Sequence, residues 1–126
     1  MKNQEVCILD YGSGNVGSVY NLLNRLNYKI KISNESSDIK NSSHLILPGV
    51  GAFGDSIEKI KSKIPVDLLK DEVCSKKKPF LGICVGMQVL ADKGYEFGEN
   101  DGLGWIKGSV KKINAKKKNL GFTHKG

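Results

Sequence analysis

Short apolar runs of strand length alternate with segments of helical period along this chain. VCILD (6–10) is a compact apolar run with β-branched residues, and in VGSVYNLLNRL (16–26) the apolar side chains recur every three or four positions. Parallel strands need a long crossover between them, usually a helix, so this order favours parallel pairing. The alternation predicts an α/β fold with an open, mostly parallel sheet and helices on both faces.

The remaining strands are expected where apolar runs are short or alternate with polar residues. YKIKIS (28–33) alternates like a half-buried strand, HLILP (44–48) is a short buried strand closed by its proline, and PFLGI (79–83) is typical of a central strand. GLGWIKGSVKKI (102–113) suits an outer strand exposed on one side. The polar segment 33–43 is expected only to link its neighbours.

Three further helices are expected from their start and stop signals. Asp55 is followed three residues later by Glu58, the arrangement of a capping box, ahead of apolar residues at helical spacing. A second helix is expected after Pro65. A third is expected in GMQVLADKG (86–94), where Gly94 would end it.

Composition limits the class of protein. A chain of 126 residues is one domain's length, and no apolar stretch approaches the roughly 18 residues of a membrane span. The N-terminus lacks the pattern of a secretory signal, so we expect a cytoplasmic protein. The net charge of +7 arises partly from lysine clusters at 76–78 and 116–118. No aromatic residues are interleaved there for base stacking, so neither nucleic acid nor membrane is expected as a partner.

The three cysteines predict neither a metal site nor a disulfide framework. Cys7, Cys74 and Cys84 are odd in number, and none of them lies at the spacing of a metal-binding pair. Cys7 falls in a strand and Cys74 on a helix face, where a small buried apolar residue is the simpler interpretation. Cys84 is different, because it stands between two glycines in a loop.

Three glycine-rich loops are expected at the carboxyl edge of the sheet, where such folds carry their chemistry. The first, DYGSGNVG (10–17), contains the GxGxxG spacing of a dinucleotide site, with Glu35 downstream. Asp10 precedes the glycines, however, and its carboxylate would face the pyrophosphate. We therefore interpret the spacing as coincidental and expect no cofactor. The second loop, PGVGAFGD (48–55), suits either a plain turn or a set of N–H donors for an oxyanion.

The third loop, GICVG (82–86), has the form of a nucleophile elbow with cysteine at its centre. Gly82 and Gly86 are needed because the sharp turn from strand to helix leaves no room for larger side chains. The turn would expose Cys84 at the foot of a helix, whose macrodipole favours the thiolate, and would direct the Val85 N–H toward an oxyanion. The alternative is a buried core cysteine.

Taken together, the motifs resemble one known family. LDYGSGNVGSV, LILPGVGAFGD and PFLGICVGMQ, followed by GLGWIKGSV, are similar to the glutamine amidotransferase subunits of imidazole glycerol phosphate synthase, of the triad class. The resemblance spans essentially the whole chain in register. It implies a doubly wound sheet of the class I glutamine amidotransferase type, with residues 1–126 as the N-terminal portion of a single domain.

The resemblance also implies roles for individual residues. Cys84 would attack the side-chain amide of glutamine, releasing ammonia and leaving a glutamyl thioester that water hydrolyses to glutamate. Gly49, Val50 and Gly51 would form the oxyanion strand, with the Val50 N–H as a donor. Gly51 and Gln88 would contact bound glutamine.

A partner is implied as well. Asn15 would face a (βα)8-barrel synthase subunit in a heterodimer. Ammonia would pass through that barrel to a phosphorylated ribulosyl intermediate of histidine biosynthesis. The products would be imidazole glycerol phosphate and an aminoimidazole carboxamide ribotide.

The chain departs from the family in its catalytic base. A thiol nucleophile needs a histidine to move the proton and a carboxylate to orient that histidine. The family supplies both from a later His-x-Glu segment, which is not found here. His124 stands in THKG with no carboxylate behind it. By register Asn119 replaces a histidine outside the triad, so neither His124 nor His44 is expected to be the base.

Two accounts explain this departure: a truncated amidotransferase, or a protein that keeps the first portion of the fold without glutaminase activity. Truncation is favoured, and it would leave a sheet edge and apolar faces uncovered. Three functions stay open. They are the glutaminase subunit of the histidine pathway, an amidotransferase subunit for surface-sugar biosynthesis of the lipopolysaccharide type, and a catalytically dead module that binds the synthase.

Overall fold

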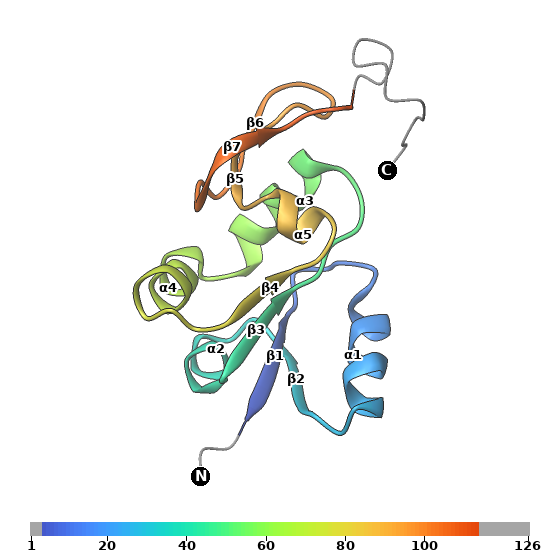
Figure 1. Cartoon of the computed structure of the whole chain (residues 1–126), viewed down its shortest axis with the longest axis vertical. Coiled ribbons are helices and arrows are strands. Elements are labelled where there is room, and N and C mark those ends of the chain that lie inside the picture. The colour runs from blue at the N-terminus through green and yellow to red at the C-terminus, as the bar shows by residue number, and fades with distance from the viewer. Residues whose placement is uncertain (1–3, 114–126) are drawn as a thin grey trace.

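The computed structural model describes residues 4–113, which form two β-sheets with helices around them (Figure 1). The first sheet is four-stranded, with the order β2-β1-β3-β4, and the second is three-stranded, with the order β6-β5-β7. The strands are β1 (Glu5–Leu9), β2 (Lys29–Ser33), β3 (His44–Leu47), β4 (Phe80–Gly82), β5 (Ala91–Gly94), β6 (Asn100–Asp101) and β7 (Ile106–Val110). The helices are α1 (Val16–Arg25), α2 (Ser36–Asn41), α3 (Phe53–Lys63), α4 (Val66–Lys70), the π-helix η1 (Asp71–Ser75) and α5 (Val85–Gln88).

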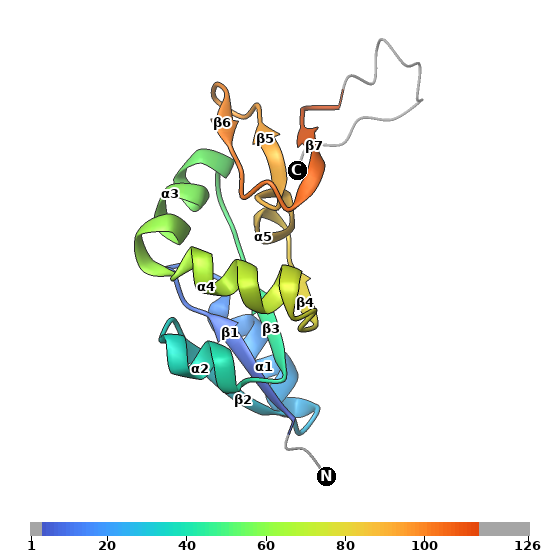
Figure 2. The same cartoon turned by 90° about the vertical axis from the view of Figure 1, so that its left-hand side faces the viewer.

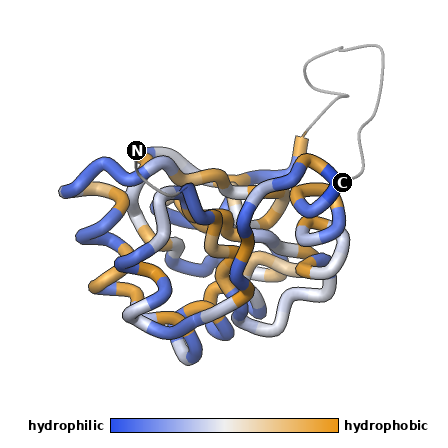
Figure 3. The backbone as a smooth tube through the Cα atoms, turned by 90° about the horizontal axis from the view of Figure 1, so that it is seen from below, coloured by the Kyte–Doolittle hydropathy of each residue, from blue (hydrophilic) through white to orange (hydrophobic). Residues whose placement is uncertain are grey.

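The four-stranded sheet is parallel throughout, as the alternation of strands and helices predicts. Successive side chains of β1 enter two different cores, because neighbouring strand residues point to opposite faces. Cys7 and Leu9 join the core under α2, α3 and α4, whereas Val6 and Ile8 pack with α1. Figure 2 shows α2 and α4 in front of the sheet and α1 behind it. In Figure 3 apolar and polar positions alternate along the helical segments, as expected for helices with one buried face.

The segment 33–43, expected only as a link, contains a helix. Helix α2 occupies Ser36–Asn41, and its Ile39 side chain is fully buried. The Asp38 carboxylate accepts a hydrogen bond from the Ser33 hydroxyl at 2.6 Å and holds the helix against the end of β2. One buried apolar residue in a polar segment is too weak a pattern to indicate a helix, which explains the wrong prediction.

The helix expected over 86–94 is also wrong beyond its first turn. Helix α5 ends at Gln88, and the chain turns into β5, which pairs with β6 and β7. Gly94 belongs to that strand, where an added Cβ would lie 2.5 Å from the Phe53 ring. The outer strand expected over 102–113 is present as β7, although it belongs to the second sheet.

Two smaller expectations are corrected by contacts distant in sequence. Helix α3 begins at Phe53, so Asp55 lies inside its first turn and forms no capping box with Glu58. The Phe53 N–H instead donates to the Glu96 carboxylate at 2.9 Å. Strand β4, expected at the centre of the sheet, lies at its edge among the described strands.

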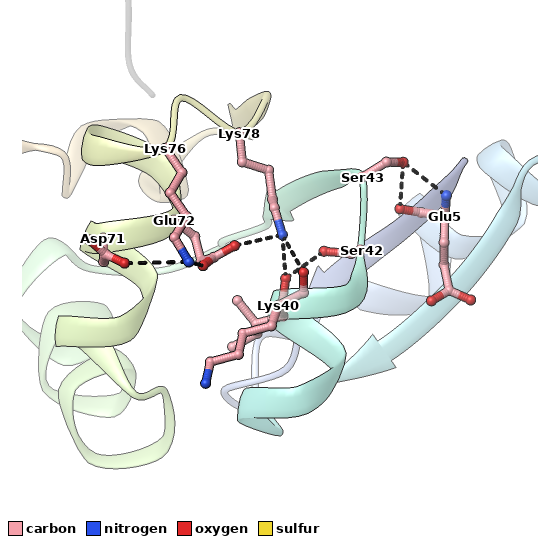
Figure 4. A network of polar contacts seen from close by, with 9 residues as sticks. Glu5, Lys40, Ser42, Ser43, Asp71, Glu72, Lys76 and Lys78 are labelled. Atoms are coloured by element: carbon pink, nitrogen blue, oxygen red, sulfur yellow. Dashed lines mark hydrogen bonds and ion pairs between the residues drawn. The ribbon is translucent and has the colours of Figure 1, made fainter. Parts of the chain in front are cut away.

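A buried carboxylate joins the π-helix to α2 and to the segment that leads into β4 (Figure 4). Glu72 is 3% exposed and pairs with Lys76 at 2.7 Å and with Lys78 at 2.9 Å. The Lys78 ammonium also donates to the carbonyl oxygens of Ile39 and Lys40, in the last turn of α2. Hydrogen bonds from Lys76 and Lys78 lower the pKa of the Glu72 carboxyl below its usual range.

No helix within residues 4–113 combines the length and the apolar character that a membrane span requires.

Replacing Glu72 by glutamine tests this network. We expect Glu72→Gln to lower the free energy of unfolding by about 2 kcal/mol at pH 7, because it weakens two charge-assisted hydrogen bonds at a buried site. The folded-state pKa is depressed, so the wild-type advantage is complete above about pH 4.5 and shrinks as the pH falls below that value. Urea unfolding at a series of pH values measures both effects. Glu58→Gln on an exposed position of α3 is the control, with an expected change within about 0.5 kcal/mol; an equal loss there would contradict the assignment.

Candidate active site

Three loops meet at the carboxyl end of the four-stranded sheet (Figure 1). They are the β1–α1 loop (residues 10–15), the β3–α3 loop (residues 48–52) and the elbow (residues 82–86), which joins β4 to α5. Strands β1, β3 and β4 are parallel neighbours, so the loops that follow them emerge side by side. The three loops singled out in the sequence are therefore brought to one edge.

Cys84 occupies the tip of the elbow in a strained conformation. Its φ of 54° and ψ of −121° lie in a region that glycine adopts far more readily than other residues. Its side chain is exposed, and its carbonyl accepts hydrogen bonds from the N–H groups of Met87 at 2.9 Å and Gln88 at 3.1 Å. The alternative of a buried core cysteine is thus wrong for Cys84. Because α5 has only four residues, the macrodipole at Cys84 is that of a single turn.

The two glycines of the elbow are required by close backbone contacts. A Cβ on Gly82 would lie 2.7 Å from the Gly86 carbonyl oxygen and 2.8 Å from the Met87 Cα. A Cβ on Gly86 would overlap the Leu47 carbonyl oxygen, at the end of β3. The elbow therefore packs directly on the end of β3, where the β3–α3 loop begins.

The β3–α3 loop lies against the elbow through Gly49. A Cβ there would overlap the Val85 side chain and would lie 2.7 Å from the Gly86 nitrogen. Val50 is 53% exposed, and Gly51 has a φ of +104°, which only glycine adopts without strain. Within residues 4–113, the N–H groups of these three loop residues and of Val85 donate to no other backbone group. These four N–H groups are therefore unpaired with backbone acceptors in the described part of the chain, at the edge that carries Cys84.

Asn15 and Gln88 lie at the same edge but on different elements. Asn15 is the residue before α1; its amide oxygen accepts a hydrogen bond from the Ser13 hydroxyl at 2.6 Å, and its side chain does not cap the helix. Gln88 is the last residue of α5 and is half-buried. Asn15 therefore belongs to the β1–α1 loop, and Gln88 to the turn that carries Cys84.

Two residues at this edge were missed by the sequence reasoning. Tyr11 is buried, and its hydroxyl donates to the Pro48 carbonyl at 2.5 Å. Glu96, in the turn after β5, accepts from the N–H of Phe53 at the end of the β3–α3 loop. Neither contact has a sequence signal, because each joins residues about 40 positions apart.

Of the other candidates, two fall within residues 4–113, and both His44 and Cys7 lie away from this edge. His44 begins β3 and so stands at the end of the sheet opposite Cys84; its Nδ1 lies 2.9 Å from the Ser43 hydroxyl. Burial raises the pKa of the Cys7 thiol to about 11, which makes it unreactive. Asn119 and His124 lie outside the described residues. Across residues 4–113, no group of three or more His, Cys, Asp and Glu side chains gathers in a way that suits a metal ion.

Comparison with known proteins identifies the family of this chain and confirms the class of its fold. The family described as Glutamine amidotransferase class-I matches residues 7–125, and the chain belongs to that family. A crystal structure of a glutamine amidotransferase shares the fold, with a TM-score of 0.67 at 20% identity over 82% of this chain and 54% of that one.

Among individual proteins, the chain is similar to imidazole glycerol phosphate synthase subunits HisH. The subunit of Leptospira interrogans is 46% identical over 107 residues, 85% of this chain and 52% of the relative. HisH 2 of Vibrio vulnificus (strain YJ016) is 45% identical over 107 residues, 84% of this chain and 50% of the relative. The chain thus spans about half the length of these relatives.

An alanine at Gly86 tests the packing of the elbow on β3. We expect Gly86→Ala to lower the free energy of unfolding by about 3 kcal/mol, because the new methyl group overlaps the Leu47 carbonyl oxygen. The matched control is Gly17→Ala in α1, where nothing lies within 4 Å of an added Cβ. That variant should gain about 0.5–1 kcal/mol from helix propensity. Thermal or urea unfolding of both compares them, and equal effects would contradict the described contact.

The backbone strain at Cys84 has a test of its own. Cys84→Gly should be more stable than Cys84→Ala by about 1–2 kcal/mol, since only glycine adopts this φ and ψ freely. Both variants remove the thiol, so the difference between their urea midpoints isolates the backbone. If alanine is tolerated as well as glycine, the elbow does not hold Cys84 under strain.

Proposed function

We propose that this chain is the N-terminal portion of the glutaminase subunit of an imidazole glycerol phosphate synthase. That subunit would hydrolyse glutamine to glutamate and ammonia and pass the ammonia to a (βα)8-barrel synthase subunit in histidine biosynthesis. The observation that carries the proposal is the exposed Cys84 on a strained elbow, packed against a glycine loop whose N–H groups donate to no backbone group within residues 4–113. The HisH names of the relatives support the choice of pathway.

The chemistry begins with attack of the Cys84 sulfur on the amide carbon of glutamine. As the C–S bond forms, negative charge develops on the amide oxygen, and the N–H groups of Val50 and Val85 are proposed to bind it. The C–N bond then breaks, and ammonia leaves with the proton of the thiol. Water adds to the thioester, which yields glutamate and restores the thiol.

The proton needs a carrier that residues 4–113 do not place beside Cys84. Their one histidine, His44, lies at the other end of the sheet. We therefore propose that the base and its orienting carboxylate come from a later His-x-Glu segment of the family. Gly51 and Gln88 would contact the glutamine, and Asn15 would face the barrel subunit in the heterodimer.

We also propose that residues 1–126 are one portion of a single domain, in a cytoplasmic protein that needs no cofactor. A groove of about 420 Å³ lies between α1 and the edge strand β4. Its lining is largely apolar, and it includes Leu23, Leu26 and Leu81, the last of which is 55% exposed. The relatives are about twice as long as the matched segment, which supplies enough chain to cover the groove and pair with β4.

The proposed chemistry predicts that Cys84 alone among the thiols reacts with a glutamine analogue. In the complete amidotransferase with its synthase subunit, 6-diazo-5-oxo-L-norleucine should alkylate Cys84 with loss of nitrogen, and excess glutamine should protect it. Mass spectrometry of peptides locates the adduct. Cys84→Ala should abolish ammonia release, whereas Cys74→Ala, with a half-buried thiol on η1, should retain it.

The outcomes also separate the alternatives. Labelling of Cys84 without ammonia release would indicate a site that still binds glutamine but lacks its base. Absence of both labelling and release would favour the catalytically dead binding module. Ammonia release with no transfer to the histidine-pathway acceptor would favour an amidotransferase for surface sugars.

A further inference from the structure

We propose that Tyr11 is a positioning residue, whose hydroxyl fixes the β3–α3 loop so that its N–H donors face Cys84. The inference rests on the proposed function, because it assigns those donors to the oxyanion. It concerns a residue that does not touch the substrate but acts through the carbonyl of Pro48 and the peptide groups that follow it.

The contact itself is short and enclosed. Tyr11 is 2% exposed, and its hydroxyl donates to the Pro48 carbonyl oxygen at 2.5 Å, 37 positions away. Burial raises the pKa of the Tyr11 phenol, and a hydrogen bond with Ser13 acts in the opposite direction; a phenol with a raised pKa is protonated at neutral pH. A phenylalanine would fill the same space, so packing does not account for the hydroxyl; its polar partners are the Pro48 carbonyl and the Ser13 hydroxyl of its own loop.

The hydrogen bond holds the start of the loop from one side while the elbow holds it from the other. The Pro48 carbonyl belongs to the peptide that leads into Gly49, and Gly49 has no room to move toward Val85 or Gly86. An added Cβ on Gly49 would also lie 2.8 Å from the Tyr11 hydroxyl. The peptide between Pro48 and Gly49 is therefore fixed, and rotation is left to the peptides on either side of Val50.

The same tyrosine connects the two loops at this edge. The Gly14 backbone lies beside the Val50 side chain, close enough that an added Cβ would be 3.5 Å from the Val50 Cγ2 atom. The β1–α1 loop therefore meets the β3–α3 loop at two points, one under its start and one at its exposed tip. A displacement of the β1–α1 loop would reach the Val50 donor through both contacts.

The first test is kinetic and uses the complete amidotransferase with its synthase subunit. Tyr11→Phe should lower kcat for glutamine hydrolysis about tenfold and leave KM within about twofold, because a displaced donor weakens binding of the oxyanion more than of the ground state. The matched control is Tyr20→Phe, which also removes a phenol oxygen. Tyr20 lies in α1 and packs against the core formed by Val6, Ile8 and Ile46. Its kcat should be unchanged.

The second test reads the loop directly and does not depend on turnover. In the same preparations, ¹⁵N relaxation dispersion of the Gly49, Val50 and Gly51 amides should show added microsecond-to-millisecond exchange in Tyr11→Phe and none in Tyr20→Phe. Added exchange together with the lowered kcat supports the proposal.

An unchanged kcat in Tyr11→Phe overturns the proposal. So does a lowered kcat without added exchange at the Gly49, Val50 and Gly51 amides. If the wild-type complex hydrolyses no glutamine, the proposed function fails on its own. The dispersion measurement then still decides whether Tyr11 fixes the loop.

Discussion

The whole edge depends on the absence of side chains where β3 and β4 end. Gly49, Gly82 and Gly86 bring backbone against backbone, and at each of them a single methyl group would collide with a neighbouring chain segment. This proximity places a glycine-rich turn next to a cysteine that follows a different strand. The strain at Cys84 is held in place by the same packing, since the elbow has no room to relax toward β3.

Interactions away from this edge hold β4 in the register that lets the elbow pack on the end of β3. Lys78 stands two residues before β4, and its ammonium group is bound both to Glu72 and to the last turn of α2. The ion pair and these hydrogen bonds therefore fix the position at which β4 begins along its neighbour β3. Phe80 in β4 packs edge-on against Trp105, with the two ring centroids 5.4 Å apart. This contact joins the first sheet to the residues before β7. A displacement of β4 would move Cys84 with it.

Local sequence patterns were enough to predict the parallel sheet and the place of the elbow. The apolar runs of β1 and β3 are buried on both faces, so their composition alone indicates strands, and G-x-C-x-G at the end of β4 indicates the turn. The failures share one cause, which is that the deciding contact is distant in sequence. Glu96 caps α3 in place of Asp55, and pairing with β7 turns the expected helix after Gln88 into β5. The roles of the site residues stay predictions.

The β3–α3 loop is fastened at both of its ends, by Tyr11 at the Pro48 carbonyl and by Glu96 at the Phe53 N–H. Surface loops usually tolerate insertions and deletions, because their ends remain joined whatever the path between them. Here four residues, 49–52, must bridge two fixed points while Gly49 stays packed against the elbow. Related chains should therefore keep the length of this segment, with Val50 and Ala52 the positions that vary most freely.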